Sequence, residues 1–549
     1  MAGAVSAGAY TAGVIDYLIE TLDEWERRKK EGVKNTPMHN VEIPAIGGAS
    51  AGGMTSIIMA SLLNDLFQPV QESPNNILNE MPGNKLYHSW VDLTNEDMFS
   101  EMLKTDDLKE DVESLFNSKF IDVVAQRMVD TIDTKFKDRS YFSKKLKLFV
   151  TLSNLKGFKY NLAFRADNLV QNKYYVERHN DYACFVMGEK NYQNKGWIPL
   201  SFRERLNSQM AANAAMATGA FPLGLKSRNI SRKVEYIIDN KWLKIKEAEP
   251  IIEEKEIRHD HIVDGGMINN EPFDKVNELL KEKLIEEGLI DEGQDVSNNY
   301  SDFMSTILMI DPFPATESKF SKKRDILSIA GKTLGAMLGQ IRTKPDDVIS
   351  TFQSDNSAQF MIAPTRSFPK YAANNEEKRQ GSKAIACGFF GGFGGFFNKE
   401  FRVHDFFLGR ANCEYFLRNH FTVPEKSNNP IIKIGYEGID KTKFYSKTDK
   451  GNEGLPIIPV FGDATDNPYL PTFSCGEDWP KQNFKDMEKQ YKSQIKMRAQ
   501  EIISNMDLGK NGFQRSLIWM ANKFYLRNKA AKGFLGLVKD EMSDHKLLK

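Results

Sequence analysis

The sequence predicts an α/β fold, because strand-like and helix-like segments alternate from its beginning. Residues 41–46 form a short apolar run typical of a strand, and residues 54–63 can be buried as a helix. Ahead of them, apolar residues recur at helical spacing on one face, and basic residues 27–30 followed by Gly32 suit a helix C-terminus. Further strand-like runs predict that the sheet continues at 146–153, 182–187 and 306–310.

The first strand and the helix after it are joined by Gly48-Ala49-Ser50-Ala51-Gly52, a G-x-S-x-G sequence. In such a turn, small flanking residues let the backbone bend sharply and leave the serine hydroxyl exposed at the tip. Ser50 is therefore a candidate nucleophile. A Gly/Ala-rich helix start without chemistry would show the same residues, so the motif alone leaves both interpretations open.

The chain opens with another Gly/Ala-rich stretch, residues 2–13, which leads into the first helix. A glycine-rich turn at a helix N-terminus presents unpaired N–H groups to an anion. A nucleophilic serine needs such donors to hold the oxyanion of a tetrahedral intermediate. The alternative is a helix start that needs small residues only for packing, but the pairing with Ser50 is more informative than either stretch alone.

Later, His261-Ile262-Val263 predicts a strand that ends at Asp264-Gly265-Gly266. A serine hydroxyl is a weak nucleophile unless a neighbouring base takes its proton. An aspartate at the end of a strand can be that base when its surroundings tune it toward the working pH. In isolation, Asp-Gly-Gly is more often an ordinary turn.

Together these motifs resemble the patatin-like phospholipases. The resemblance rests on Gly8-Ala9-Tyr10 with Ala12-Gly13-Val14, on the Ser50 motif, and on Asp264-Gly265-Gly266 with Asn270 and Pro272. It extends over about residues 1–315 and implies a three-layer α/β/α domain that hydrolyses lipid acyl esters, with a lipid or fatty-acyl ester as substrate and no metal or organic cofactor. It implies that Ser50 is the nucleophile and Asp264 the base of a Ser–Asp dyad. Motif support comes from Gly48, Gly52, Gly265 and Gly266, and the implied oxyanion hole consists of Ala51 N–H and the backbone of Gly3, Ala4, Val5, Ser6, Ala7 and Gly8.

The sequence departs from the family pattern at its beginning. The family usually has three consecutive glycines and often a basic residue before the equivalent of Gly8, whereas Ala4, Val5 and Ala7 stand there. Backbone donors survive such changes as long as φ stays negative. The family's first strand normally precedes this turn, so the resemblance also implies a core strand ahead of Met1.

We expect three regions along the chain. Residues 1–315 form the catalytic domain, with a mainly helical insertion at 64–145 that caps the site and a charged insertion at 226–260 that presents a solvated face. Residues 316–470 form a mixed extension packed on this domain. A helical C-terminal region follows at 471–549.

Two other functions stay open at this point. A Ser-His-Asp esterase of the α/β-hydrolase type would draw its histidine from His404 or His420, although Ser50 comes earlier than that fold places its nucleophile. His261 is an odd number of residues from Asp264 and therefore faces the opposite side of the strand. A catalytically degenerate, lipid-binding scaffold is the non-enzymatic alternative, supported by the altered glycine-rich turn.

Composition excludes several classes of protein. The 549 residues carry 74 basic and 74 acidic side chains, a balance that argues against binding nucleic acid through overall charge. The four cysteines lack the short spacing of a zinc site and indicate a reduced compartment without disulfides. No run of 18 apolar residues could span a bilayer as a helix. The expected location is the cytoplasm, with peripheral membrane contact.

Two segments are candidates for that membrane contact. Ala384–Phe397 alternates glycine with phenylalanine and could enter a lipid interface, cover an acyl pocket, or form an aromatic core segment. Asn511–Lys539 carries basic residues with interleaved large apolar ones, as an interfacial helix on anionic lipid does. A C-terminal helix packed on the protein is the alternative for this second segment.

Overall fold

The architecture is that of a computed structural model. It describes residues 1–66, 68–72, 84–109, 111–130, 136–163, 173–188, 196–246, 248–294, 296–297, 299–301, 303–314, 359–366, 379–446, 454–461, 480–506 and 527–549.

A mixed sheet at the centre of the molecule confirms the α/β prediction. Its strands lie in the order β4-β3-β2-β6-β5, and β1 pairs in parallel with one end of the long β2. Because β2 pairs with β1, β3 and β6, strands that come before and after it in the sequence lie in one sheet. The strands are β1 (Ile43–Gly48), β2 (Phe142–Ala163), β3 (Lys173–Met187), β4 (Ile198–Leu200), β5 (Arg228–Lys233) and β6 (Ile257–Asp264).

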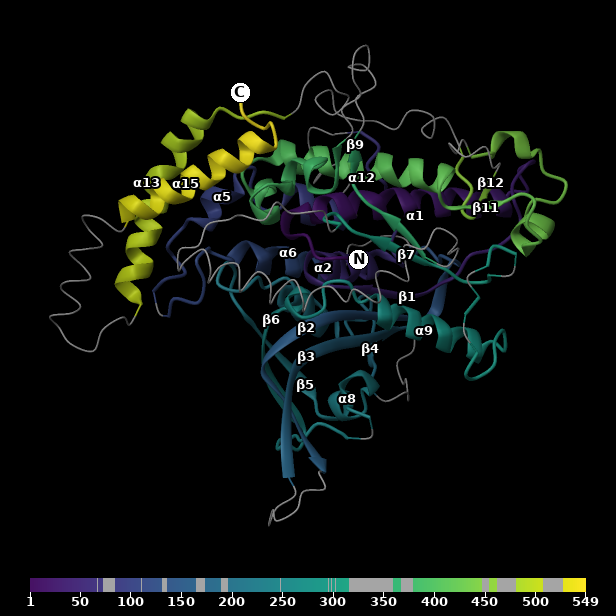
Figure 1. The fold of residues 1–549 in the computed structure, drawn as a ribbon, viewed down its shortest axis with the longest axis horizontal. Helices are drawn as coiled ribbons and strands as arrows, with labels where there is room; N and C mark the ends of the chain where they lie inside the picture. Colours follow the sequence, from purple (N-terminus) through teal and green to yellow (C-terminus); the bar gives the residue numbers. More distant parts are fainter. Residues whose placement is uncertain are drawn as a thin grey trace, which may run out of the picture.

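Helices cover this sheet, and Figure 1 shows the first helix lying beside a helix from the C-terminal half of the chain. The expected helices around the serine motif are present; α2 is almost entirely buried, and α1 is buried along most of its length before its charged last turn, because their apolar residues pack into one core. The helices of the first half are α1 (Gly8–Lys30), α2 (Ser50–Leu62), α4 (Lys85–Tyr87), α5 (Met98–Met102), α6 (Lys119–Val129), α7 (Ser208–Thr218), α8 (Glu235–Ile238) and α9 (Phe273–Glu286). Those of the second half are α12 (Lys399–Asn419), α13 (Phe484–Asn505) and α15 (Arg527–Asp544).

The strand predicted at 146–153 is longer than its apolar run indicates. Asn154 and Gly157 suggest a turn, but β2 passes through them with a bulge, since its register with β3 shifts between Ser153 and Phe158. Gly157 takes up the irregularity at a φ of +69°. β2 and β3 then continue as a hairpin that projects from the sheet (Figure 1).

In the charged segment 226–260, the described lysine and glutamate side chains are exposed or half-buried, whereas several arginine and aspartate side chains are buried. The segment supplies β5 and the first half of β6, which pair with each other and join the central sheet through β2. Arg232 on β5 is buried and forms ion pairs with Asp181 at 2.6 Å and Asp260 at 2.9 Å. These charges are tolerated inside the protein because each carboxylate and the guanidinium find partners there.

The strand at 306–310 also differs from its predicted place as the last strand of the central sheet. β7 (Ile307–Ile310) pairs in parallel with β8 (Gln359–Ile362) in a separate two-stranded sheet. The first two residues of the chain connect the two sheets, because the Met1 ammonium donates to Gly47 O at 2.8 Å and Ala2 N–H donates to Ile310 O at 2.9 Å.

The two candidate membrane segments have different outcomes. Most side chains of Ala384–Phe397 are buried, and Phe389 is fully enclosed, so the structure favours the aromatic core segment over lipid insertion. The segment forms three short 3-10 turns, η7 (Ala386–Gly388), η8 (Phe390–Gly392) and η9 (Gly394–Phe396). Of Asn511–Lys539, residues 511–526 lie outside the described residues, and the remainder belongs to α15, which packs against α13 (Figure 1).

Candidate active site

Ser50 lies at a sharp turn between β1 and α2. Its φ is +50°, a conformation that a non-glycine residue adopts only where the surroundings hold it. A Cβ on Gly48 would lie 2.6 Å from the backbone of Gly52, which explains why the turn needs glycine at its start. The Ser50 N–H donates to Thr218 Oγ1 at 2.9 Å, so the end of α7 supports the strained residue.

The serine hydroxyl meets the predicted aspartate. Ser50 Oγ donates to Asp264 Oδ2 at 2.7 Å, and both residues are buried. The other carboxylate oxygen, Oδ1, accepts the N–H of Gly266 at 2.7 Å, which fixes the orientation of the carboxylate. The two residues, 214 positions apart in the sequence, are thus in direct hydrogen-bond contact.

Asp264 is held in the sheet from both sides. It pairs with Leu152 on β2, its carbonyl accepts the hydroxyl of Ser153 at 2.8 Å, and its N–H donates to Ala220 O at 2.9 Å. The supporting roles of Ser153 and Thr218 were not predicted from the sequence. They follow from strand register and from where α7 ends, and single positions in the sequence carry no signal for either.

The N-terminal turn passes directly beside Ser50. A Cβ on Gly3 would lie 2.7 Å from the Ser50 Cβ, so only glycine lets this backbone come so close. The turn continues as η1 (Val5–Ala7), in which Ala7 N–H donates to Ala4 O and Gly8 N–H donates within the turn.

This leaves a narrower set of donors than the six residues named from the resemblance. Within the described part of the chain, the N–H groups of Gly3, Ala4, Val5 and Ser6 have no acceptor, whereas those of Ala7 and Gly8 do. Ala51 lies in the first turn of α2, where N–H groups lack an intrahelical acceptor. Available amides therefore come from two directions, the N-terminal turn and the start of α2.

The condition of negative φ is met at one of the substituted positions of this turn and not at another. Val5 has a φ of +46°, which is unfavourable for a β-branched residue. Ala4, by contrast, keeps a φ of −153°. The presence of valine where the family usually has glycine therefore introduces strain that the rest of the structure has to hold.

Asn270 adds an unpaired polar group beside the site. Its Oδ1 is buried without a hydrogen bond and lies close to both glycine turns, since a Cβ on Gly3 or on Gly266 would come within 2.5 Å and 2.6 Å of it. A buried amide oxygen without a hydrogen bond lowers the stability of the folded protein, and this one lies beside the candidate oxyanion site.

The histidines considered for a triad have other partners. His404 on α12 is buried, with Nδ1 2.7 Å from Asp405 Oδ1 and Nε2 3.0 Å from Arg366. His420 follows α12 and contacts the rings of Tyr415 and Phe416. His261 is exposed on the opposite face of β6 and bonds Ser227.

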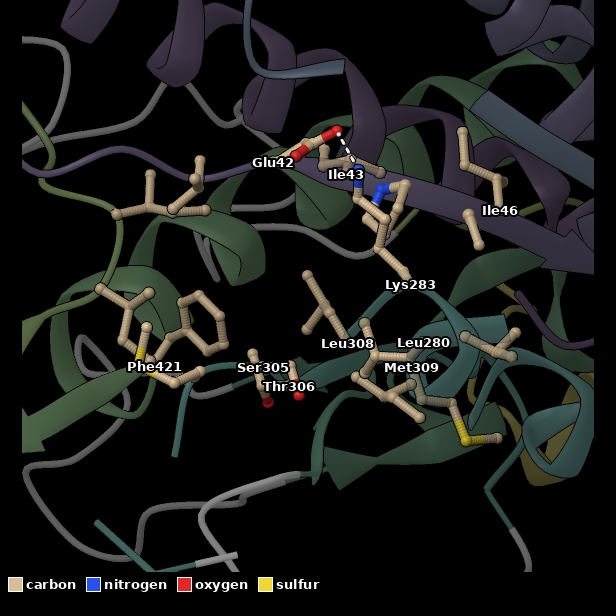
Figure 2. Close-up of a pocket in the computed structure, with 18 of the residues that line it drawn as sticks. Glu42, Ile43, Ile46, Leu280, Lys283, Ser305, Thr306, Leu308, Met309 and Phe421 are labelled. Carbon is tan, nitrogen blue, oxygen red and sulfur yellow. Dashed lines mark ion pairs between the residues drawn. The ribbon is translucent and has the colours of Figure 1, made fainter. Parts of the chain in front are cut away.

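A separate apolar cavity of about 600 Å³ lies between the facing edges of β1 and β7. Figure 2 shows Ile43 and Ile46 on one side, Leu308 and Met309 on the other, and a Glu42–Lys283 ion pair at 3.3 Å. Met1 and Ala2 also line the cavity, and burial lowers the pKa of the Met1 ammonium to about 6. Neither Ser50 nor Asp264 lines this cavity, so it is distinct from the serine site.

Metal ligands and membrane-spanning helices are both absent from the described residues. These residues contain no group of three or more His, Cys, Asp or Glu side chains arranged to hold a metal ion. Among their helices, none combines the length and apolar character needed to cross a membrane.

Comparisons with known proteins agree with the motifs. The family model for patatin-like phospholipase matches residues 1–276, which include both Ser50 and Asp264. The chain is also 30% identical over 515 residues to the uncharacterized protein y4iI of Sinorhizobium fredii (strain NBRC 101917 / NGR234), an alignment that covers 84% of this chain and 70% of that protein. No solved structure matches the chain significantly.

Proposed function

Because the chain belongs to the patatin-like phospholipase family, a family of lipid acyl hydrolases, we propose that it hydrolyses carboxylic esters of lipids through a Ser50–Asp264 dyad. The observation that carries the proposal is the 2.7 Å hydrogen bond between Ser50 Oγ and Asp264 Oδ2. Direct contact between nucleophile and carboxylate leaves no place for an imidazole between them, which favours a dyad over a triad.

Acylation begins when Ser50 Oγ attacks the ester carbonyl carbon while Asp264 accepts its proton. The carbonyl π electrons move onto oxygen, and the resulting oxyanion is stabilised by Ala51 N–H and by the free amides of the N-terminal turn. Collapse of the intermediate breaks the bond to the alcohol oxygen, which takes the proton from Asp264 and leaves. The product is an acyl-Ser50 enzyme.

Deacylation repeats these steps with water. Asp264 accepts a proton from water as the hydroxyl oxygen adds to the acyl carbon, and the intermediate collapses to a fatty acid and the Ser50 alkoxide, which recovers the proton from Asp264. Transfer to another hydroxyl compound would use the same geometry, with that acceptor in the position of water.

Labelling with a fluorophosphonate probe, together with hydrolysis of a panel of phospholipids and neutral glycerolipids, tests the proposal. Wild type should label and release fatty acid, whereas Ser50→Ala should do neither. Asp264→Asn keeps the shape but cannot accept the proton, and should lower kcat by roughly 10³-fold or more.

Ser61→Ala is the matched control. Ser61 is buried on the same helix and donates to Ile58 O at 2.7 Å, so its loss changes α2 packing without touching the dyad. Equal labelling of wild type and Ser50→Ala would refute the enzymatic proposal and leave the lipid-binding scaffold as the better interpretation.

A further inference from the structure

The N-terminal turn contains a strained residue that its own sequence does not stabilise. Val5 is held at a φ of +46°, and such a conformation persists in a β-branched residue only when the surrounding structure determines it. Its neighbours on either side, Ala4 and Ser6, carry two of the N–H groups available to an oxyanion. Whatever holds Val5 in place therefore also aims these donors.

The restraint on Val5 comes from residues Ala384–Phe397 in the second half of the chain, called here the Gly/Phe segment. The Ser6 hydroxyl donates to Gly392 O and accepts the N–H of Gly395 at 2.9 Å. The fit is close, because a Cβ on Gly395 would lie 2.7 Å from Ser6 Oγ and one on Gly392 would lie 3.0 Å from Ala4 O. One buried side chain thus joins the turn to two points that lie 386 and 389 positions away in the sequence.

The segment itself is anchored by buried charges on α12. Asp405 accepts the N–H groups of Ala386 at 2.7 Å and Cys387 at 2.8 Å, one on each carboxylate oxygen. Arg402 donates to Gly395 O at 2.6 Å. Because Asp405 and Arg402 are fully buried, these charge-assisted bonds hold the segment rigidly against the turn.

We propose that Ser6 is a positioning residue, through which the Gly/Phe segment holds the strained Val5 turn and aligns its amides with the oxyanion. This inference rests on the proposed function and adds a role for the second half of the chain. It also explains how alanine and valine can stand where glycines are usual, since an external hydrogen-bonded support replaces the conformational freedom of glycine.

The test compares Ser6→Ala, Val5→Gly and the double variant in ester hydrolysis and in the rate of fluorophosphonate labelling. Ser6→Ala should lower kcat by about 10- to 100-fold with little change in KM, because misplaced donors affect the transition state more than substrate binding. Val5→Gly removes the strain at its source. The double variant should therefore recover most of the lost kcat, which a merely structural role for Ser6 would not produce.

Ser446→Ala is the matched control, because Ser446 is also buried and accepts the N–H of a glycine, Gly454, at 3.2 Å. It should leave kcat unchanged. Full kcat in Ser6→Ala, or a double variant no better than Ser6→Ala, would overturn the inference while wild type still labels at Ser50. Absence of labelling and turnover in wild type would instead refute the proposed function, and this inference with it.

Discussion

The contact between α1 and α12 can be tested by adding one methyl group. Gly13 on α1 faces the backbone of Phe406, and a Cβ at Gly13 would lie 1.9 Å from the Phe406 carbonyl oxygen. The contact is reciprocal, because a Cβ on Gly409 would lie 2.2 Å from Tyr10 O. Real Cβ atoms essentially never approach closer than 3.0 Å, so in Gly13→Ala the two helices have to separate by about 1 Å.

Whether Gly13→Ala stabilises or destabilises the protein depends on two opposing contributions, helix propensity and overpacking. Alanine is favoured over glycine inside a helix by about 1 kcal/mol. Overpacking a well-packed contact costs about 1–3 kcal/mol, and the upper end applies because a backbone carbonyl cannot rotate away. Gly13→Ala should therefore be destabilised by about 2 kcal/mol, measured as a lower urea midpoint at unchanged m-value.

The same substitution elsewhere provides the control. A Cβ on Gly536 of α15 would have no atom within 4 Å, so Gly536→Ala gains helix propensity without a clash and should be stabilised by up to about 1 kcal/mol. Unfolding of Gly13→Ala at the same urea concentration as Gly536→Ala would contradict the close backbone contact between α1 and α12.

Three further predictions concern the site and the chain start. Thr218→Val leaves the buried Ser50 N–H without its acceptor and should lower the free energy of unfolding, measured with urea, by about 1–3 kcal/mol. It should also slow the labelling of Ser50 by the fluorophosphonate probe. In a protein that begins at Met1, the Met1 ammonium has a folded pKa of about 6, below an unfolded value of 8.0, so unfolded chains bind more protons between these values. The free energy of unfolding should therefore fall by about 2 kcal/mol as the pH drops from 8 to 6, and this loss should vanish when residues joined ahead of Met1 remove the charge. Replacing His261, His404 or His420 singly by alanine should leave ester turnover in the folded protein, and abolished turnover in any of these variants that still shows native circular dichroism would contradict the dyad.

The parts of the site that the sequence predicted are those that depend on local turns. Ser50 comes just after β1 and Asp264 ends β6, and each has glycines within two residues, because a sharp turn or a close backbone approach demands them. The same glycines make the motifs visible without knowledge of the fold. The supporting roles of Thr218 and Ser153 could not be predicted, because they depend on how α7 and β2 meet the loops.

The buried charges of segment 226–260 could not be predicted for a related reason. The described lysine and glutamate side chains there are exposed or half-buried, but β6 alternates exposed and buried positions, and its buried positions include Arg258 and Asp260. A charged side chain on the inner face is stable only when a partner from another strand meets it, as Asp181 meets Arg232. Such partners are set by register between distant strands, which one sequence does not reveal.

The packing also bears on how the second half of the chain relates to the first. One continuous core contains Ile15 and Leu18 of α1 together with Phe406 of α12, so these helices are buried by each other. Asp16 is buried beside them, and although burial raises its pKa to about 6, Arg410 and Asn84 supply the partners that make a charge there tolerable. Without α12, α1 would expose its apolar face and leave that carboxyl without its cation, and α1 begins where the N-terminal turn ends. Helix α12 therefore completes the core on which the candidate oxyanion turn depends.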